Sequence, residues 1–85
     1  MECLIIKKYK PLSINQSLPE DLEIEINRYL DYLNSGDTGV EDCYQTEVNV
    51  ALNWCSREHL LTEDNIIALK NYYVFGGIHK GIQNK

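Results

Sequence analysis

Apolar residues recur at helical spacing in three segments of this chain, and polar residues fill the positions between them. In the first segment the apolar residues from Leu22 to Leu33 stand mostly three or four places apart, which puts them on one face of an α-helix. The second segment repeats this spacing from Val40 onward, and the third does so from Ile66 to Val74. The pattern therefore predicts an all-α protein with helices over residues 18–34, 40–57 and 63–75.

A hydroxyl residue stands ahead of each predicted helix: Ser17, Thr38 and Thr62. A side-chain oxygen at this position accepts a hydrogen bond from a backbone N–H that the first helical turn leaves without a partner. Glu20 and Glu41 follow the first two hydroxyls three residues later and complete two capping boxes, whereas Asn65 closes the third less well. Gly36 and Gly76 stand where the first and third helices are expected to end.

The two ends of the chain lack this helical spacing. Residues 1–12 contain an apolar, partly β-branched run, and Pro11 disfavours a helix at the residue before it. We expect them to form an extended N-terminal arm that packs on the helices. Residues 77–85 follow as a basic tail or one further short turn. Because the connections are short and the chain has only 85 residues, we predict a single helical domain over residues 1–85, a small three- to four-helix bundle.

The second predicted helix is apolar over more than half of its circumference. Beside its main stripe, Cys43, Val50 and Trp54 form a second stripe, with Glu47 and Arg57 close by. The first and third helices are able to cover one of these stripes. The N-terminal arm or a partner must then cover the other.

Thirteen acidic and eight basic residues give the chain a net charge of −5. The surplus is concentrated in the middle, because only Arg28 and Arg57 oppose a dozen acids between Ser13 and Asn65. Nucleic-acid binding depends largely on clustered Lys and Arg, so this balance argues against a nucleic-acid partner. It favours a basic protein as the partner, which an acidic surface attracts.

The cysteines Cys3, Cys43 and Cys55 are odd in number and widely spaced, which does not suggest a disulfide framework. The apolar run from Cys3 to Ile6 is too short for a signal sequence or a membrane span. We therefore expect reduced thiols in a cytoplasmic protein without membrane association.

Two sets of residues offer candidate chemistry. Cys55 and His59 are spaced four residues apart and could share a helix face as a thiolate–imidazole pair. However, Cys55 falls on the core stripe, and no glycine-rich turn supplies an oxyanion hole. Together with Cys43 and His79 they could ligate zinc, but only the Cys55–His59 spacing suits such a site. We expect no enzymatic activity, no cofactor and no metal; a thiol or metal enzyme is the weakest alternative.

What remains is a surface that suits contact with another protein. In size and acidity the chain is similar in kind to bacteriocin and toxin immunity proteins, although no motif assigns it to a family. We expect a protein-binding inhibitor of the immunity-protein or antitoxin type, which blocks a basic, nuclease-like partner by charge and shape complementarity. The residues expected to contact the partner are polar, acidic and apolar positions on the first two helices and three aromatic anchors: Glu20, Glu23, Ile24, Asn27, Asp31, Asp37, Glu41, Asp42, Tyr32, Trp54 and Tyr72.

The alternative from another class is a homo-oligomer with a structural or regulatory role. In that case Cys43, Val50 and Trp54 would be buried against a symmetry-related copy, as in a homodimer.

Overall fold

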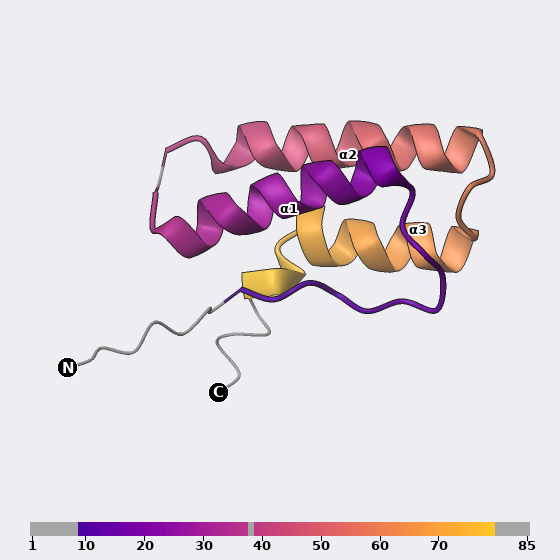
Figure 1. Cartoon of the computed structure of the whole chain (residues 1–85), viewed down its shortest axis with the longest axis horizontal. Helices are drawn as coiled ribbons and strands as arrows, with labels where there is room; N and C mark the ends of the chain where they lie inside the picture. The colour runs from indigo at the N-terminus through magenta and orange to yellow at the C-terminus, as the bar shows by residue number, and fades with distance from the viewer. Residues whose placement is uncertain (1–8, 38, 80–85) are drawn as a thin grey trace.

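The computed structural model describes residues 9–37 and 39–79 and forms a small all-α bundle, as the sequence predicts. Its helices are α1 (Glu20–Ser35), α2 (Glu41–Arg57), α3 (Glu63–Leu69) and the π-helix η1 (Lys70–Val74). Figure 1 shows α1 and α2 side by side along the bundle, and α3 and η1 both pack against α2. Thr38, most of the predicted arm and most of the predicted tail lie outside the described residues.

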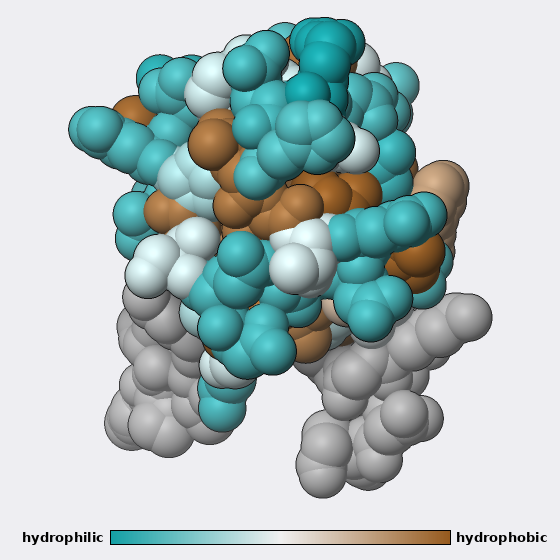
Figure 2. Space-filling view, turned by 90° about the vertical axis from the view of Figure 1, so that its right-hand side faces the viewer, coloured by the Kyte–Doolittle hydropathy of each residue, from teal (hydrophilic) through white to brown (hydrophobic). Residues whose placement is uncertain are grey.

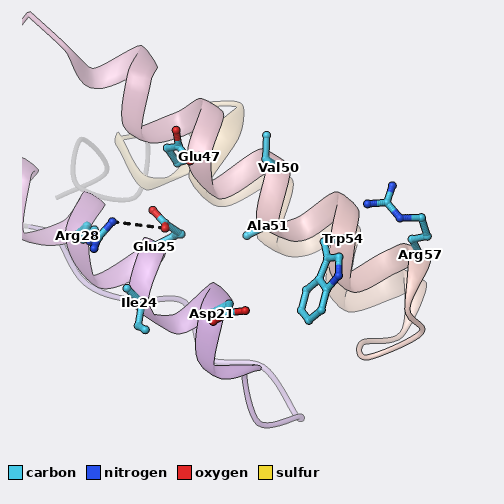
Figure 3. A pocket seen from close by; sticks show the side chains of 9 residues that line it. All are labelled: Asp21, Ile24, Glu25, Arg28, Glu47, Val50, Ala51, Trp54 and Arg57. Carbon is cyan, nitrogen blue, oxygen red and sulfur yellow. Dashed lines mark ion pairs between the residues drawn. The ribbon is translucent and has the colours of Figure 1, made fainter.

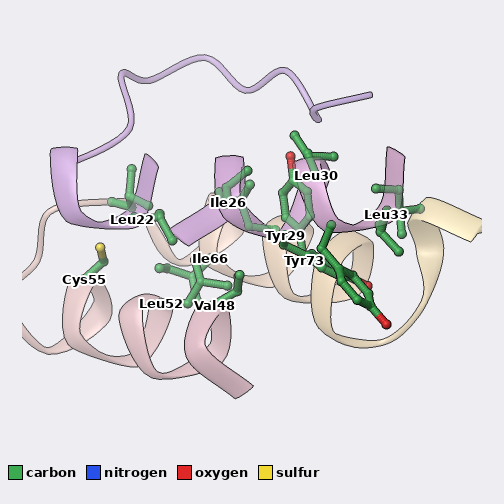
Figure 4. Packing of buried hydrophobic residues seen from close by; sticks show 14 residues of the cluster. Leu22, Ile26, Tyr29, Leu30, Leu33, Val48, Leu52, Cys55, Ile66 and Tyr73 are labelled. Carbon is green, nitrogen blue, oxygen red and sulfur yellow. The ribbon is translucent and has the colours of Figure 1, made fainter. Parts of the chain in front are cut away.

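A single layer of apolar side chains holds the helices together. Leu22, Ile26 and Tyr29 point inward from α1 and are almost completely buried, as their helical spacing predicts. Leu52 on α2 and Ile66 on α3 meet them in the same cluster (Figure 4). Complete burial of a side chain of this size contributes roughly 1.5–3 kcal/mol, so this layer is the main source of stability.

The predicted cap of the first helix is not formed. Helix α1 begins at Glu20 behind Pro19, and no side chain caps it, so the predicted box that starts at Ser17 is wrong. The reason is that Leu18 packs against the core, which keeps the chain extended up to Pro19. Helix α2 begins behind Val40, and its predicted cap residue, Thr38, lies outside the described residues.

The hydroxyl of Thr62 is the cap that does form. It accepts a hydrogen bond of 3.3 Å from the backbone N–H of Asn65, although this tetrad has the weakest closing residue of the three. At the other end of α1, Gly36 ends the helix with a φ of 87°, as expected from its position.

The third predicted helix, 63–75, is divided into two parts. Helix α3 ends at Leu69, and the chain continues as the π-helix η1, in which the N–H of Phe75 bonds to the carbonyl of Lys70 at 2.9 Å. The wider turn lets two consecutive tyrosines reach the N-terminal arm. The Tyr73 hydroxyl accepts from the N–H of Leu12 at 2.8 Å, and the Tyr72 hydroxyl donates to the carbonyl of Lys10 at 2.7 Å.

The arm is extended from Tyr9 to Pro19, longer than predicted, and it packs on the helices as expected (Figure 1). The side chain of Asn34 makes two 3.0 Å hydrogen bonds with the backbone of Tyr9, and Leu12 packs against the core. The arm therefore lies along α3, η1 and the end of α1. It leaves the second apolar stripe of α2 uncovered, because Val50 and Trp54 remain exposed.

The cap of α3 gives a direct test of these boundaries. We expect Thr62→Ala to lower the free energy of unfolding by about 1 kcal/mol, because it removes the acceptor for the Asn65 N–H. Ser17→Ala is the matched control, and it should change the free energy by no more than about 0.5 kcal/mol. Urea denaturation of both variants measures this difference. An equal loss in the two variants would contradict the observed start of α1.

Candidate functional site

An open groove of about 570 Å³ lies between α1 and α2 and is the candidate site of this molecule. Successive turns of both helices provide its walls. Figure 3 shows the lining side chains, which are Asp21, Ile24, Glu25 and Arg28 from α1 and Glu47, Val50, Ala51, Trp54 and Arg57 from α2.

The middle of the groove is apolar. Ile24, Val50 and Trp54 are 42 %, 57 % and 37 % exposed, which is unusual for large apolar side chains that lie together. The indole of Trp54 extends from α2 toward the first turns of α1 (Figure 3). The groove is thus the uncovered stripe of α2 with one branched residue of α1 facing it.

Charged side chains surround this apolar middle. Arg28 and Arg57 lie at opposite ends of the groove (Figure 3), and Arg28 Nη1 is 3.6 Å from Glu25 Oε2. This ion pair is exposed, so it contributes little to stability. Asp21 and Glu47 carry further negative charge into the groove. The site therefore offers both hydrophobic contact and fixed charges of both signs, with acids in the majority.

The acidic face predicted on α1 adjoins the groove. Glu20, Glu23, Asn27 and Asp31 are all exposed, and their spacing puts them on one face of α1 next to Ile24. Two further predicted acids, Asp37 and Asp42, are exposed near the start of α2. Of the predicted contact residues, only Ile24 and Trp54 line the groove itself.

Three predicted contact residues are engaged inside the protein instead. Tyr32 is only 7 % exposed, and its hydroxyl accepts from the N–H of Val40 at 3.2 Å, so the expectation of a surface anchor was wrong. Tyr72 is half-buried because its hydroxyl holds the arm. Glu41 is half-buried in a cluster of hydrogen bonds. In each case the side chain satisfies an internal contact that helical spacing alone does not reveal.

Glu41 joins α1, α2 and the C-terminal turn. Its Oε2 accepts from the Tyr29 hydroxyl at 2.7 Å and lies 2.6 Å from His79 Nε2. Burial acts to raise the pKa of Glu41, but the hydrogen bonds from His79 and Tyr29 outweigh it and hold the pKa below its usual value. Burial also raises the pKa of Tyr29 well above its usual range, and the bond to Glu41 adds to this shift. This cluster therefore ties elements together, with Tyr29 as a neutral donor.

The structure does not form the thiolate–imidazole pair that the spacing of Cys55 and His59 would allow. Helix α2 ends at Arg57, and His59 adopts a left-handed conformation with a φ of 58° and is exposed, whereas Cys55 is completely buried. Burial raises the pKa of the Cys55 thiol, and the carboxylate of Asp21 raises it further. A thiol of this kind stays protonated and is a poor nucleophile. Among the described residues, no three His, Cys, Asp or Glu side chains are grouped so as to hold a metal ion.

Several groove residues were not among the predicted contacts, namely Asp21, Glu25, Arg28, Glu47, Val50, Ala51 and Arg57. The signal for those on α2 is present in the sequence, where Val50 and Trp54 form a second stripe flanked by Glu47 and Arg57. For α1 the signal is weak. Ile24 stands at the boundary between the acidic face and the groove, so the sequence alone does not say to which side it belongs.

Figure 2 views the end of the bundle where α1 begins and α2 ends, and shows apolar surface enclosed by hydrophilic side chains. Over the described residues, none of the helices combines the length and apolar character that crossing a membrane requires. Comparison with protein-family models, with curated proteins and with solved structures finds no match for this chain.

The Glu41 cluster predicts an acid-dependent loss of stability. Because the pKa of Glu41 is depressed in the folded state, its contribution is complete above the ordinary glutamate pKa and is lost as the pH falls below it. We expect Glu41→Gln to cost about 1 kcal/mol at neutral pH and to make the free energy of unfolding fall less steeply on acidification.

The measurement is urea denaturation from neutral to acidic pH. Asp42→Asn is the matched control, since its side chain is exposed on the same turn of α2. That variant should keep the pH dependence of the wild type. Identical pH profiles for Glu41→Gln and the wild type would contradict the proposed role of the cluster.

Proposed function

We propose that this chain is a small acidic protein-binding module of the inhibitor type. In this proposal it covers a basic surface of a nuclease-like partner, as an immunity protein or an antitoxin does, and it has no reactive centre of its own. The observation that carries the proposal is the groove, in which apolar side chains are open to solvent beside an acidic helix face. Over residues 9–37 and 39–79, twelve carboxylates oppose four Lys and Arg side chains.

The acidic face and the groove would serve different steps of binding. The carboxylates attract a positively charged surface over a distance, which raises the rate of association. Apolar anchors such as Trp54 are then removed from water on contact, and this mainly lengthens the lifetime of the complex. A purely charged surface would give fast but short-lived contacts, so the combination suits an inhibitor.

The geometry of α1 fits a cleft that normally holds phosphates. Glu20, Glu23 and Asp31 run along one exposed face, and an α-helix rises 1.5 Å per residue, so the row is about 16 Å long. A partner whose Lys and Arg side chains line such a cleft would meet carboxylates in place of phosphates. The inhibitor would then compete directly with the partner's substrate.

A homodimer is the alternative that the exposed stripe of α2 favours. Val50 and Trp54 are exposed, and Cys43 lies exposed on the same helix, so a second copy could cover them. Two copies that each carry a net charge of −5 repel one another, which is why we favour a basic partner. Light scattering separates the two cases, because a stable dimer with a blue-shifted Trp54 emission would support the alternative.

The proposal predicts how a captured partner associates. After capture from the source cells, the association rate constant with the purified partner should fall with ionic strength. The double variant Glu23→Gln/Asp31→Asn should associate several-fold more slowly than the wild type, because it removes charge from the α1 face. Stopped-flow fluorescence of Trp54, the single tryptophan of the chain, follows the reaction.

The matched control is Glu58→Gln/Glu63→Gln, which changes the net charge equally at the α2–α3 connection. It should slow association less than the α1 variant. An acidic captured protein, or an association rate that does not respond to salt, would overturn the proposed function.

A further inference from the structure

The groove between α1 and α2 is a place on the bundle surface where one more helix could pack. Helix α2 packs against α1, α3 and η1, so its first apolar stripe is covered on that side. The described part of the arm, from Tyr9 onward, lies along α3 and η1 and does not line the groove. The groove between α1 and α2 is therefore a shallow trough bounded by two neighbouring helices, with nothing from residues 9–37 or 39–79 lying in it.

The residues that line this trough repeat at the spacing of a helix–helix seam. The lining positions on α1 include Asp21, Ile24 and Arg28, and those on α2 include Glu47, Val50 and Trp54. Steps of three and four residues put them in line along each helix, as in the contacts between bundle helices. Two such rows side by side form a groove into which the side chains of another helix can pack.

We propose that this groove seats one amphipathic α-helix of the basic partner, which completes the molecule as a four-helix bundle. The inference rests on the proposed function, since it specifies which element of the basic partner is bound and where. The lining of α2 spans eleven residues from Glu47 to Arg57, so a helix of about three turns fills the groove. Its apolar row packs on Ile24, Val50 and Trp54.

The charges of the groove define the polar side of that helix. Lys or Arg residues on either side of its apolar row would face Asp21, Glu25 and Glu47. Arg28 and Arg57, at the two ends, would repel a helix that is basic along its whole length. The occupant therefore carries its basic residues in the middle turns and neutral or acidic residues at its ends.

A helix suits this site better than the other common binding modes. An extended peptide usually binds by adding to the exposed edge of a sheet, and the described part of the chain contains only helices and irregular segments. A second copy of this chain is disfavoured by charge. Its exposed start of α3 carries the acids Glu63 and Asp64, and these would meet acids of the same sign in the groove. A basic amphipathic helix provides both the apolar row and the opposite charge.

Selection from a random peptide library on the full-length protein tests the inference. We expect the enriched peptides to carry apolar residues three and four positions apart, with Lys or Arg between them. Such peptides should gain helical circular dichroism on binding and shift the emission of Trp54 to the blue. Val50→Glu should weaken their binding at least about tenfold, because it puts a charge into the apolar middle.

Ile67→Glu is the matched control, because Ile67 is equally exposed but lies on α3 outside the groove. Its affinity for the selected peptides should stay within about twofold of the wild type. Basic peptides without helical spacing, or helical peptides that Val50→Glu binds as well as the wild type does, would overturn this inference and leave the proposed function standing.

Other outcomes separate the two proposals further. Enrichment of acidic or uncharged peptides would overturn both. A library that yields no enriched sequence would overturn the helical occupant alone, since a basic partner could still bind through the α1 face. Light scattering of the wild type and of Val50→Glu completes the test, because a dimer that the substitution dissociates would make the second copy the occupant.

Discussion

The whole structure depends on the packing of α1 against α2 over a core that is only one layer deep. In so small a domain each helix has a single inward face, and most of its remaining surface must face solvent. The inward faces of these helices are fully buried, as the almost complete burial of Leu22 and Ile26 on α1 and of Leu52 on α2 shows. Helix α2 carries a second apolar stripe, and residues 9–37 and 39–79 contain no further helix that covers it. The open groove follows directly from this shortage of covering elements.

The tyrosines decide where the N-terminal arm lies, and so they also decide which face stays open. Tyr72 and Tyr73 hold the arm through their hydroxyls, and the π-turn of η1 lets these two neighbours act together. The ring of Tyr29 packs against Tyr73 and Tyr44 while its hydroxyl reaches Glu41. Tyrosine is suited to this task because its ring fills the core and its hydroxyl still forms a hydrogen bond. Had the arm crossed α2 instead, Trp54 would be covered.

Helical spacing predicts the three main segments and the inward residues well, because both depend on local sequence and on a single burial direction. The ends of the helices are less predictable. Ser17 is followed by an ideal capping residue, yet the packing of Leu18 moves the start of α1 beyond it. The π-helix η1 has no sequence signal of its own, and Tyr73 within it is buried in the core. Tertiary contacts overrode local preference at both places.

The candidate site shows the same division between local and tertiary information. The second stripe of α2 is visible in the sequence, and the arm or a partner was expected to cover it. Hydrogen bonds between residues far apart in the chain, such as those of Asn34 with Tyr9, hold the described part of the arm away from this stripe. Other hydrogen bonds, from the Tyr29 hydroxyl to Glu41 and from the N–H of Val40 to the Tyr32 hydroxyl, hold Glu41 and Tyr32 inside the bundle, so acidity and aromaticity alone overestimate the number of contact residues. On this molecule α1 and α2 bring carboxylates and exposed apolar surface together at Ile24.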